Sequence, residues 1–237
     1  MIKFFRHISR QLLGEGKTGK YFKYAIGEIL LVMIGILLAL QVNNWNEGRK
    51  LQKLERSYLI GILNDLKSDT TSINKVYKPN FQEHKKNHLF LDSLVKNDLM
   101  MEESQIDMLW HPVVISKSGQ AFYPTIGTYD AMISEGNSGL IQNRDLFSSI
   151  QELYEIRHGM NAEFRQRRDK TADEIRLKYT YNFQFDSVLE LLRNKHFLAD
   201  MRFVYEYKKN YAAFIENGLM PNVIEVINNI ENNLANN

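Results

Sequence analysis

Two histidines stand at a spacing that can bring a pair of imidazoles to one metal ion. His84 and His88 lie four residues apart in a segment expected to be helical. A glutamate, Glu83, precedes the first histidine, whereas in the zinc-protease pattern the glutamate follows it. Lys85 and Lys86 lie between the histidines and would repel a cation. We therefore expect solvated surface histidines and neither a metal site nor a cofactor.

Other local motifs for catalysis are missing from the sequence. It contains no glycine-rich phosphate loop and no nucleophile elbow. The 237 residues include no cysteine, which excludes disulfides, thiolate metal sites and a Cys–His pair. We expect a protein that is not an enzyme, although a site built from residues scattered along the sequence stays open. Thirty basic and 28 acidic residues nearly balance, so net charge indicates no nucleic-acid partner.

A short basic run is the candidate for binding an anionic ligand. Arg165, Arg167 and Arg168 lie in a segment predicted to be helical. Asp169 and Glu174 follow closely, and acidic and basic side chains three or four residues apart pair on a helix surface. The alternative to an anion-binding patch is therefore a solvated helix face, and this is the favoured interpretation.

The chemically most unusual residue is a glutamate inside an apolar segment. Residues 25–42 read AIGEILLVMIGILLALQV, which contains Glu28 as its only charge. Eighteen helical residues rise about 27 Å, close to the thickness of a bilayer's hydrocarbon layer. Gly35 and Ala39 form a pair of small residues that lets helices approach closely. The face that carries them is expected to be a packing face, made of Glu28, Val32, Gly35, Ala39 and Val42.

Three interpretations of Glu28 stay open at this point. A shallow, solvated or paired carboxylate at an oligomer seam is favoured, because a charge facing lipid is costly. A protonatable group on an ion path is the alternative, and it would require a multi-span partner that this chain does not contain. The third interpretation is an interfacial charge without a special role.

The flanks of the apolar segment predict a membrane anchor that is retained. Tyr21 and Tyr24 lie at one end and Trp45 at the other, where aromatic residues contact both surfaces of a lipid bilayer. The residues after Leu40 offer no small-residue cleavage site, so we expect a signal anchor and not a cleaved signal peptide. Basic residues are more numerous before the span than after it, which favours a cytoplasmic N-terminus. They are Lys3, Arg6, Arg10, Lys17, Lys20 and Lys23 before it, and Arg49, Lys50, Lys53 and Arg56 after it.

Several sequence blocks resemble a family of uncharacterised single-span inner-membrane proteins found mainly in Bacteroidota. These blocks are MIKFFR (1–6), YAIGEI (24–29), IGIL (34–37), NNWNE (43–47), TYDAM (128–132) and SGLIQN (138–143). The resemblance implies a bacterial inner membrane with the C-terminal domain in the periplasm. It implies no activity.

The rest of the chain predicts an all-α protein, in which a single N-terminal transmembrane helix continues into a helical stalk and a soluble helical bundle. Apolar residues recur at three- and four-residue spacing after the span. Pro79 is expected to end or kink the first long helix, Gly218 and Pro221 to stop and restart the last one, and Asn143 to cap another. The predicted segments are a cytoplasmic basic amphipathic segment (1–20), a transmembrane signal anchor (21–45), a stalk (46–78) and an extracytoplasmic helical domain (79–237).

These features predict a membrane-anchored, self-associating scaffold, adaptor or sensor of the bacterial envelope. The expected partners are the lipid bilayer and either further copies of this chain or another membrane protein. The alternative is an auxiliary or gating subunit of an ion-coupled transporter, channel or motor that uses Glu28.

Overall fold

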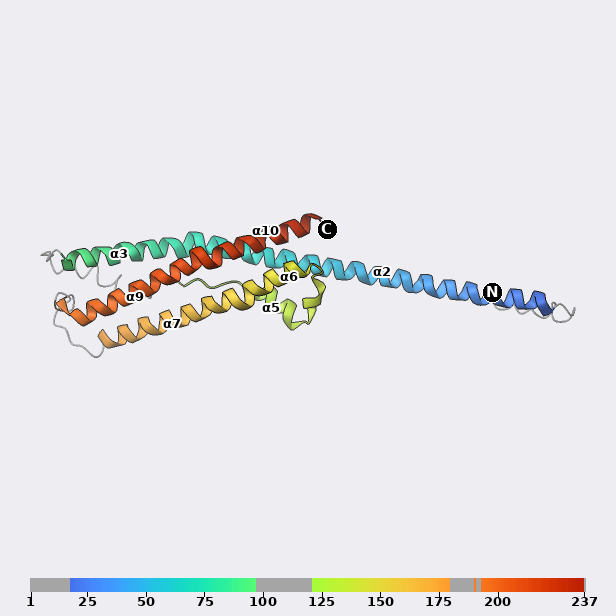
Figure 1. Cartoon of the computed structure of the whole chain (residues 1–237), viewed down its shortest axis with the longest axis horizontal. Coiled ribbons are helices and arrows are strands. Elements are labelled where there is room, and N and C mark those ends of the chain that lie inside the picture. Colours follow the sequence, from blue (N-terminus) through green and yellow to red (C-terminus); the bar gives the residue numbers. More distant parts are fainter. Residues whose placement is uncertain (1–17, 97–120, 180–189, 191–192, 237) are drawn as a thin grey trace. The chain divides into compact units, whose positions relative to one another are not determined.

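The computed structural model describes residues 18–96, 121–179, 190 and 193–236, and every regular element in these ranges is a helix (Figure 1). The predicted all-α class is confirmed. The amphipathic segment expected for residues 1–20 falls almost wholly outside the described residues.

The chain divides into two compact units, residues Met1–Leu54 and Glu55–Asn237. The first long helix, α2 (Thr18–Ser72), contributes residues to both. Within the first unit it carries a segment long and apolar enough to span a membrane, and none of that segment is buried. Its large apolar side chains are about half to two-thirds exposed, among them Ile29, Leu31, Leu38 and Val42.

The second unit is a bundle of long helices. Short π-helical segments join successive helices, so the chain keeps its direction through each junction (Figure 1). The first rod runs from α2 through Ile73–Tyr77 into α3 (Lys78–Lys96). The second consists of α6 (Arg144–Gln151), Glu152–Arg157 and α7 (His158–Leu177), and the third of α9 (Lys195–Phe214), Ile215–Leu219 and α10 (Met220–Asn236). Between the first two rods in sequence lie α5 (Gly127–Ser134) and a 3-10 turn, Asn137–Leu140.

The chain stays helical through Pro79 and through Gly218 and Pro221, so neither place ends a helix outright as predicted, and a π-helical segment interrupts the α-helix just before each proline. Each proline lies two residues after a π-helical segment, in the first turn of the helix that follows. A proline in a continuous α-helix clashes with the carbonyl four residues before it. Here that carbonyl belongs to the wider π turn, which accommodates the ring and lets the helix continue.

The core of the second unit lies between the rods and α5. Residues of α2 and the π segment after it supply one side of this core, with Leu59, Ile62, Leu66, Ile73 and Tyr77 all buried. Part of the stretch predicted as a stalk (46–78) thus belongs to the second unit, which begins at Glu55.

Two local predictions can be checked against the ends of helices. Asn143 caps α6, because its side-chain oxygen accepts a hydrogen bond from the backbone N–H of Leu146 at 3.1 Å. This confirms the predicted cap. Gly136 has φ 73°, a left-handed conformation that favours glycine, and it turns the chain between α5 and the 3-10 turn.

Candidate functional site

The predicted transmembrane packing face is exposed along its whole length. Glu28, Val32, Gly35, Ala39 and Val42 all have exposed side chains or backbone. A Cβ atom added to Gly35 would meet nothing within 4 Å. Nothing in the described part of the chain therefore covers this face.

Of the three predicted interface aromatics, one has a described side chain. Trp45 is exposed, and the guanidinium carbon of Arg49 lies 5.0 Å from its ring centroid. The side chains of Tyr21 and Tyr24 lie outside the described residues, although both residues belong to α2.

The three arginines of the predicted anionic-ligand patch do not converge on one surface. Arg167 is exposed and pairs with Glu163 at 2.5 Å. Arg165 places its guanidinium carbon 4.1 Å from the ring centroid of Tyr123. Arg168 points into the bundle, where it is 5 % exposed. The three arginines thus lie in three different environments. The buried one, Arg168, lies near other basic side chains whose proximity was not predicted from the sequence.

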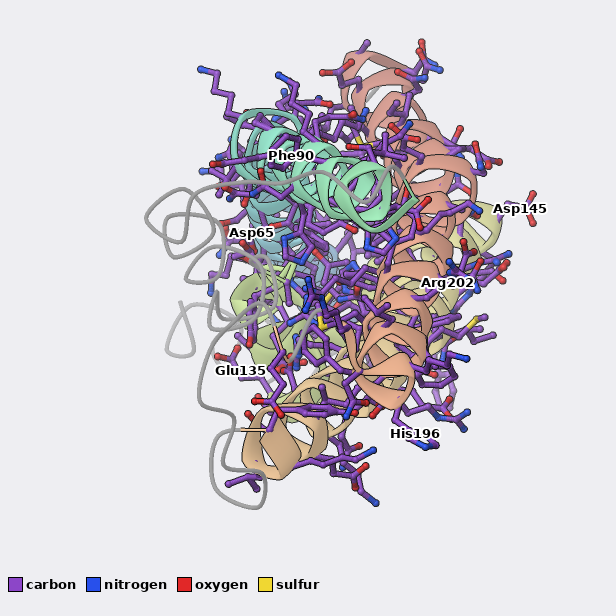
Figure 2. The ribbon with its side chains drawn as sticks, turned by 90° about the vertical axis from the view of Figure 1, so that its left-hand side faces the viewer. Asp65, Phe90, Glu135, Asp145, His196 and Arg202 are labelled. Carbon is purple, nitrogen blue, oxygen red and sulfur yellow. The ribbon has the colours of Figure 1, made fainter. Side chains whose placement is uncertain are left out.

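Arg168 belongs to a basic cluster formed by three helices, which we call the interior basic cluster. It consists of the half-buried His84 on α3 and the buried Arg168 on α7 and Lys208 on α9. Lys208 is 7 % exposed, and its ammonium contacts His84 Nε2. Arg168 donates to Asp169 Oδ1 and lies 5.7 Å from the ring centroid of Tyr211. Helix α9 contacts both α3 and α7. Figure 2 shows α3, labelled at Phe90, beside α9, labelled at Arg202.

Burial governs the charges of this cluster. It lowers the pKa of Lys208 to about 7, and the nearby charge of Arg168 adds to the effect. It also lowers the pKa of His84 to about 4, with further contributions from Lys208, His88 and Arg168. His84 is therefore neutral at pH 7, and its Nε2 atom contacts the side-chain nitrogen of Lys208.

The predicted solvated surface for His84 and His88 is wrong. Both are half-buried, and His88 stacks on the ring of Tyr205 with centroids 3.9 Å apart. Burial lowers the pKa of His88. A cavity of about 10 Å³ lies beside them, lined by His84, Asn87, His88, Met201, Val204 and Tyr205.

A second polar cluster ties α2 to the segment that leads into α5. Asp69 is 2 % exposed and accepts hydrogen bonds from both the backbone N–H and the hydroxyl of Thr125, at 2.8 to 3.1 Å. One turn earlier, Asp65 accepts the backbone N–H of Thr128 at 3.3 Å. Burial raises the pKa of Asp69 to about 6, although the bonds from Thr125 act in the opposite direction.

Next to these carboxylates lies a stack of aromatic side chains. Tyr129 stacks on Tyr154 at 4.4 Å between centroids, and Tyr154 meets the edge of His158 at 4.8 Å. The Tyr154 hydroxyl and both ring nitrogens of His158 are buried and have no hydrogen-bond partner among the described residues. Burial raises the pKa of Tyr154 and lowers that of His158 to about 4.

A third set of hydrogen bonds fixes the chain at Phe122. The Asn161 side chain donates to the Phe122 carbonyl at 3.2 Å and accepts from the Tyr211 hydroxyl at 2.7 Å. The backbone N–H of Phe122 donates in turn to the Tyr211 hydroxyl at 3.3 Å. This closed set joins α7 and α9 to the segment before α5, so its role is structural.

Comparison with known protein families matches residues 28–218, well over half of the chain, to a family of unknown function, DUF6090. The chain belongs to the DUF6090 family. No curated protein and no solved structure matches it. The predicted resemblance to an uncharacterised family is thereby confirmed at the level of the family. The DUF6090 match includes Glu28, Asp69, His84, Arg168 and Lys208.

Asp69 and Lys208 are among the buried polar residues of this DUF6090 protein that were not singled out from the sequence. The position of Lys208 along its helix could have indicated that it is buried. It shares a helix face with Val204, Tyr211 and Ile215, and the last two are fully buried. Asp69 likewise lies on a buried helix face, three residues after the buried Leu66 and four before the buried Ile73. A charged residue inside an apolar stripe is the pattern that would have found both.

Proposed function

We propose that this protein is a membrane-anchored scaffold, adaptor or sensor of the bacterial envelope that self-associates through its transmembrane helix and catalyses no reaction. In this proposal the N-terminus is cytoplasmic, the anchor lies in the inner membrane of a Gram-negative bacterium, and the helical domain lies in the periplasm. The lipid bilayer and other copies of the chain are its partners.

The observation that carries the proposal is the complete exposure of the apolar segment in α2. A core helix of a soluble protein would be largely covered by the rest of the chain. Here Leu30, Ile34 and Leu37 are each about half exposed. Removing apolar surface from water is favourable by roughly 25 cal/mol per Å², so insertion into a bilayer would stabilise such a helix.

Continuity of the helix supports a scaffold or sensor role. The same helix that carries the apolar segment goes on to provide Leu59, Ile62 and Leu66 to the core of the second unit. No flexible linker interrupts α2 between these residues and the anchor. A change in the anchor's packing would therefore act directly on a core helix of the domain, which is the coupling that a sensor or adaptor needs.

Self-association is supported by the composition of the packing face. Gly35 and Ala39 are the small residues through which transmembrane helices approach closely. Glu28 heads this face, and a carboxylate is less costly in a helix–helix interface than against lipid. Because Gly35 has open space around it, a larger side chain there disturbs no contact within the described chain.

Anchoring and orientation can be tested with single cysteines, since the natural chain contains none. We expect Lys170→Cys, on the exposed side of α7, to react with a membrane-impermeant maleimide once the outer membrane is permeabilised. Ser9→Cys should react only after the inner membrane is lysed. The reverse pattern would contradict the orientation, and release of the protein by alkaline carbonate would contradict the anchor.

Assembly can be tested by the mass of the complex in nanodiscs. We expect a defined homo-oligomer that Gly35→Leu dissociates. Gly27→Leu is the matched control, because it adds the same side chain about 100° round the helix from Glu28. It also has nothing within 4 Å. A monomer that co-purifies with a multi-span protein would contradict self-association and favour a transporter subunit, for which Glu28→Gln should abolish ion coupling.

A further inference from the structure

We propose that the helix face just after the transmembrane span, formed by Trp45, Arg49 and Lys53, binds the phosphate of an anionic phospholipid headgroup such as phosphatidylglycerol. This inference rests on the proposed anchoring of α2 in a bilayer. It holds whether or not the chain self-associates, and it gives the anchor a preferred lipid.

The first argument is that the three side chains share one exposed face. Trp45, Arg49 and Lys53 follow one another at four-residue spacing, so they lie within about 80° of one another around the helix. Trp45 is 64 % exposed, and Arg49 and Lys53 are exposed as well. An indole N–H, a guanidinium and an ammonium are all hydrogen-bond donors, and a phosphate is an acceptor.

The second argument is the direction of the Arg49 side chain. Its guanidinium carbon lies 5.0 Å from the ring centroid of Trp45, one turn back toward the span. Side chains of a helix lean toward its N-terminus, which at this end of the span is the direction of the membrane. Trp45 lies about 4–5 Å along the helix beyond Val42, within a headgroup layer about 5–8 Å thick. The guanidinium is therefore directed to the depth of the lipid phosphates.

The third argument is the charge that the segment leaves unpaired. Residues 43–54 contain three basic residues and one acidic residue, Glu47. Glu47 lies about 160° from Trp45 around the helix, and it pairs with Lys50 at 2.9 Å. Arg49 and Lys53 thus have no carboxylate partner in the part of the chain that the structure describes. The planar fork of a guanidinium matches two phosphate oxygens, so an anionic headgroup supplies the missing partner.

The test measures which lipid lies beside Trp45. The full chain with Trp110→Phe, which leaves Trp45 as its one tryptophan, is reconstituted in phosphatidylcholine vesicles. Phosphatidylglycerol or phosphatidylcholine bearing the same nitroxide near the headgroup end of an acyl chain is then added as a quencher of tryptophan fluorescence. We expect the relative binding constant to favour phosphatidylglycerol by about fivefold or more, because each basic residue near a membrane surface contributes about that factor.

The variants separate this face from the total charge. Arg49→Gln should lower the preference about fivefold. Lys50→Gln removes the same charge from a lysine that is already paired with Glu47, and it should keep most of the preference. If Trp110→Phe fails to fold, the quenching difference between the wild-type chain and Arg49→Gln reports on Trp45 instead.

Each possible result supports or overturns the proposal. Equal quenching by both lipids, or an equal loss of preference in Arg49→Gln and Lys50→Gln, would overturn it and leave the anchor standing. No quenching by either lipid would overturn the anchor as well. Excess inorganic phosphate at constant ionic strength should leave the preference unchanged. If phosphate abolishes the preference, the ligand is a free anion and the lipid site is refuted.

Discussion

Replacing Gly61 by alanine tests the close packing of α2 against α5. A Cβ atom at this position would lie 2.6 Å from Cγ2 of Thr128 and 3.1 Å from its hydroxyl. Thr128 is β-branched and therefore stiff about χ1, and its backbone N–H is held by Asp65. The methyl group cannot be accommodated by a simple change of rotamer, so the two helices must move apart.

The expected destabilisation follows from two opposing contributions. Overpacking a core by one methyl group costs about 1–3 kcal/mol. Alanine in place of glycine within a helix returns up to about 1 kcal/mol. We therefore expect Gly61→Ala to lower the free energy of unfolding by about 1–2 kcal/mol. For a domain of this size that is a fall in Tm of about 2–8 °C.

The assay is thermal unfolding followed by circular dichroism at 222 nm, with a double-mutant cycle. In the Thr128→Ala background, Gly61→Ala should be neutral or stabilising, because the methyl group that it meets is gone. Gly159→Ala is the control, since α7 leaves open space there, and it should raise stability by about 0.5–1 kcal/mol. If Gly61→Ala raises Tm as much as Gly159→Ala does, α2 and α5 do not approach as described.

Three further predictions concern the buried polar groups. The folded-state pKa of Asp69 is about 6 against an ordinary 3.8, so the folded state binds the extra proton and becomes more stable as pH falls from about 6 to 4. Asp69→Asn should remove this gain and raise stability at pH 7.5 by up to about 3 kcal/mol, measured by Tm against pH; an unchanged profile would contradict a buried carboxylate. His158 shows the opposite sign, because its folded-state pKa is about 4 against 6.5, and stability is lost as pH falls through that window. His158→Phe should reduce the acid loss in the same scan, and a steeper loss would refute its burial as a neutral ring. Asn161→Leu strands the Phe122 carbonyl and the Tyr211 hydroxyl and should cost about 2–4 kcal/mol by denaturant unfolding; a cost below 1 kcal/mol would show that the bonds are not formed.

The elements that the sequence predicted well are those with local signals. Apolar residues at three- and four-residue spacing identify the long helices, and the Asn143 cap depends on hydrogen bonds within four residues. Pro79 and Pro221 mark interruptions of the α-helix, as predicted, but the chain stays helical through both because the preceding turn is π-helical. Nothing in their neighbours announces the π-helical turn that accommodates each ring.

The interior of the bundle was harder to predict, for a physical reason. Whether His84 is solvated depends on Lys208 of α9, 124 residues further along the chain. Arg168 and Arg167 are neighbours with the same chemistry, and a rotation of 100° about the helix decides which one is buried. The sequence shows which helix faces carry polar residues. Which of those charged residues become buried depends on how helices distant in sequence pack together.

The most direct test of a self-associating membrane anchor is disulfide scanning along the transmembrane helix. Single cysteines placed in turn at positions 30–42 of the cysteine-free chain are oxidised in native membranes, and the cross-linked dimer is quantified. We expect cross-linking to peak at Val32, Gly35, Ala39 and Val42, with minima between them. Uniformly low cross-linking, or a maximum on the opposite side at Ile34 and Leu37, would contradict the proposed packing face.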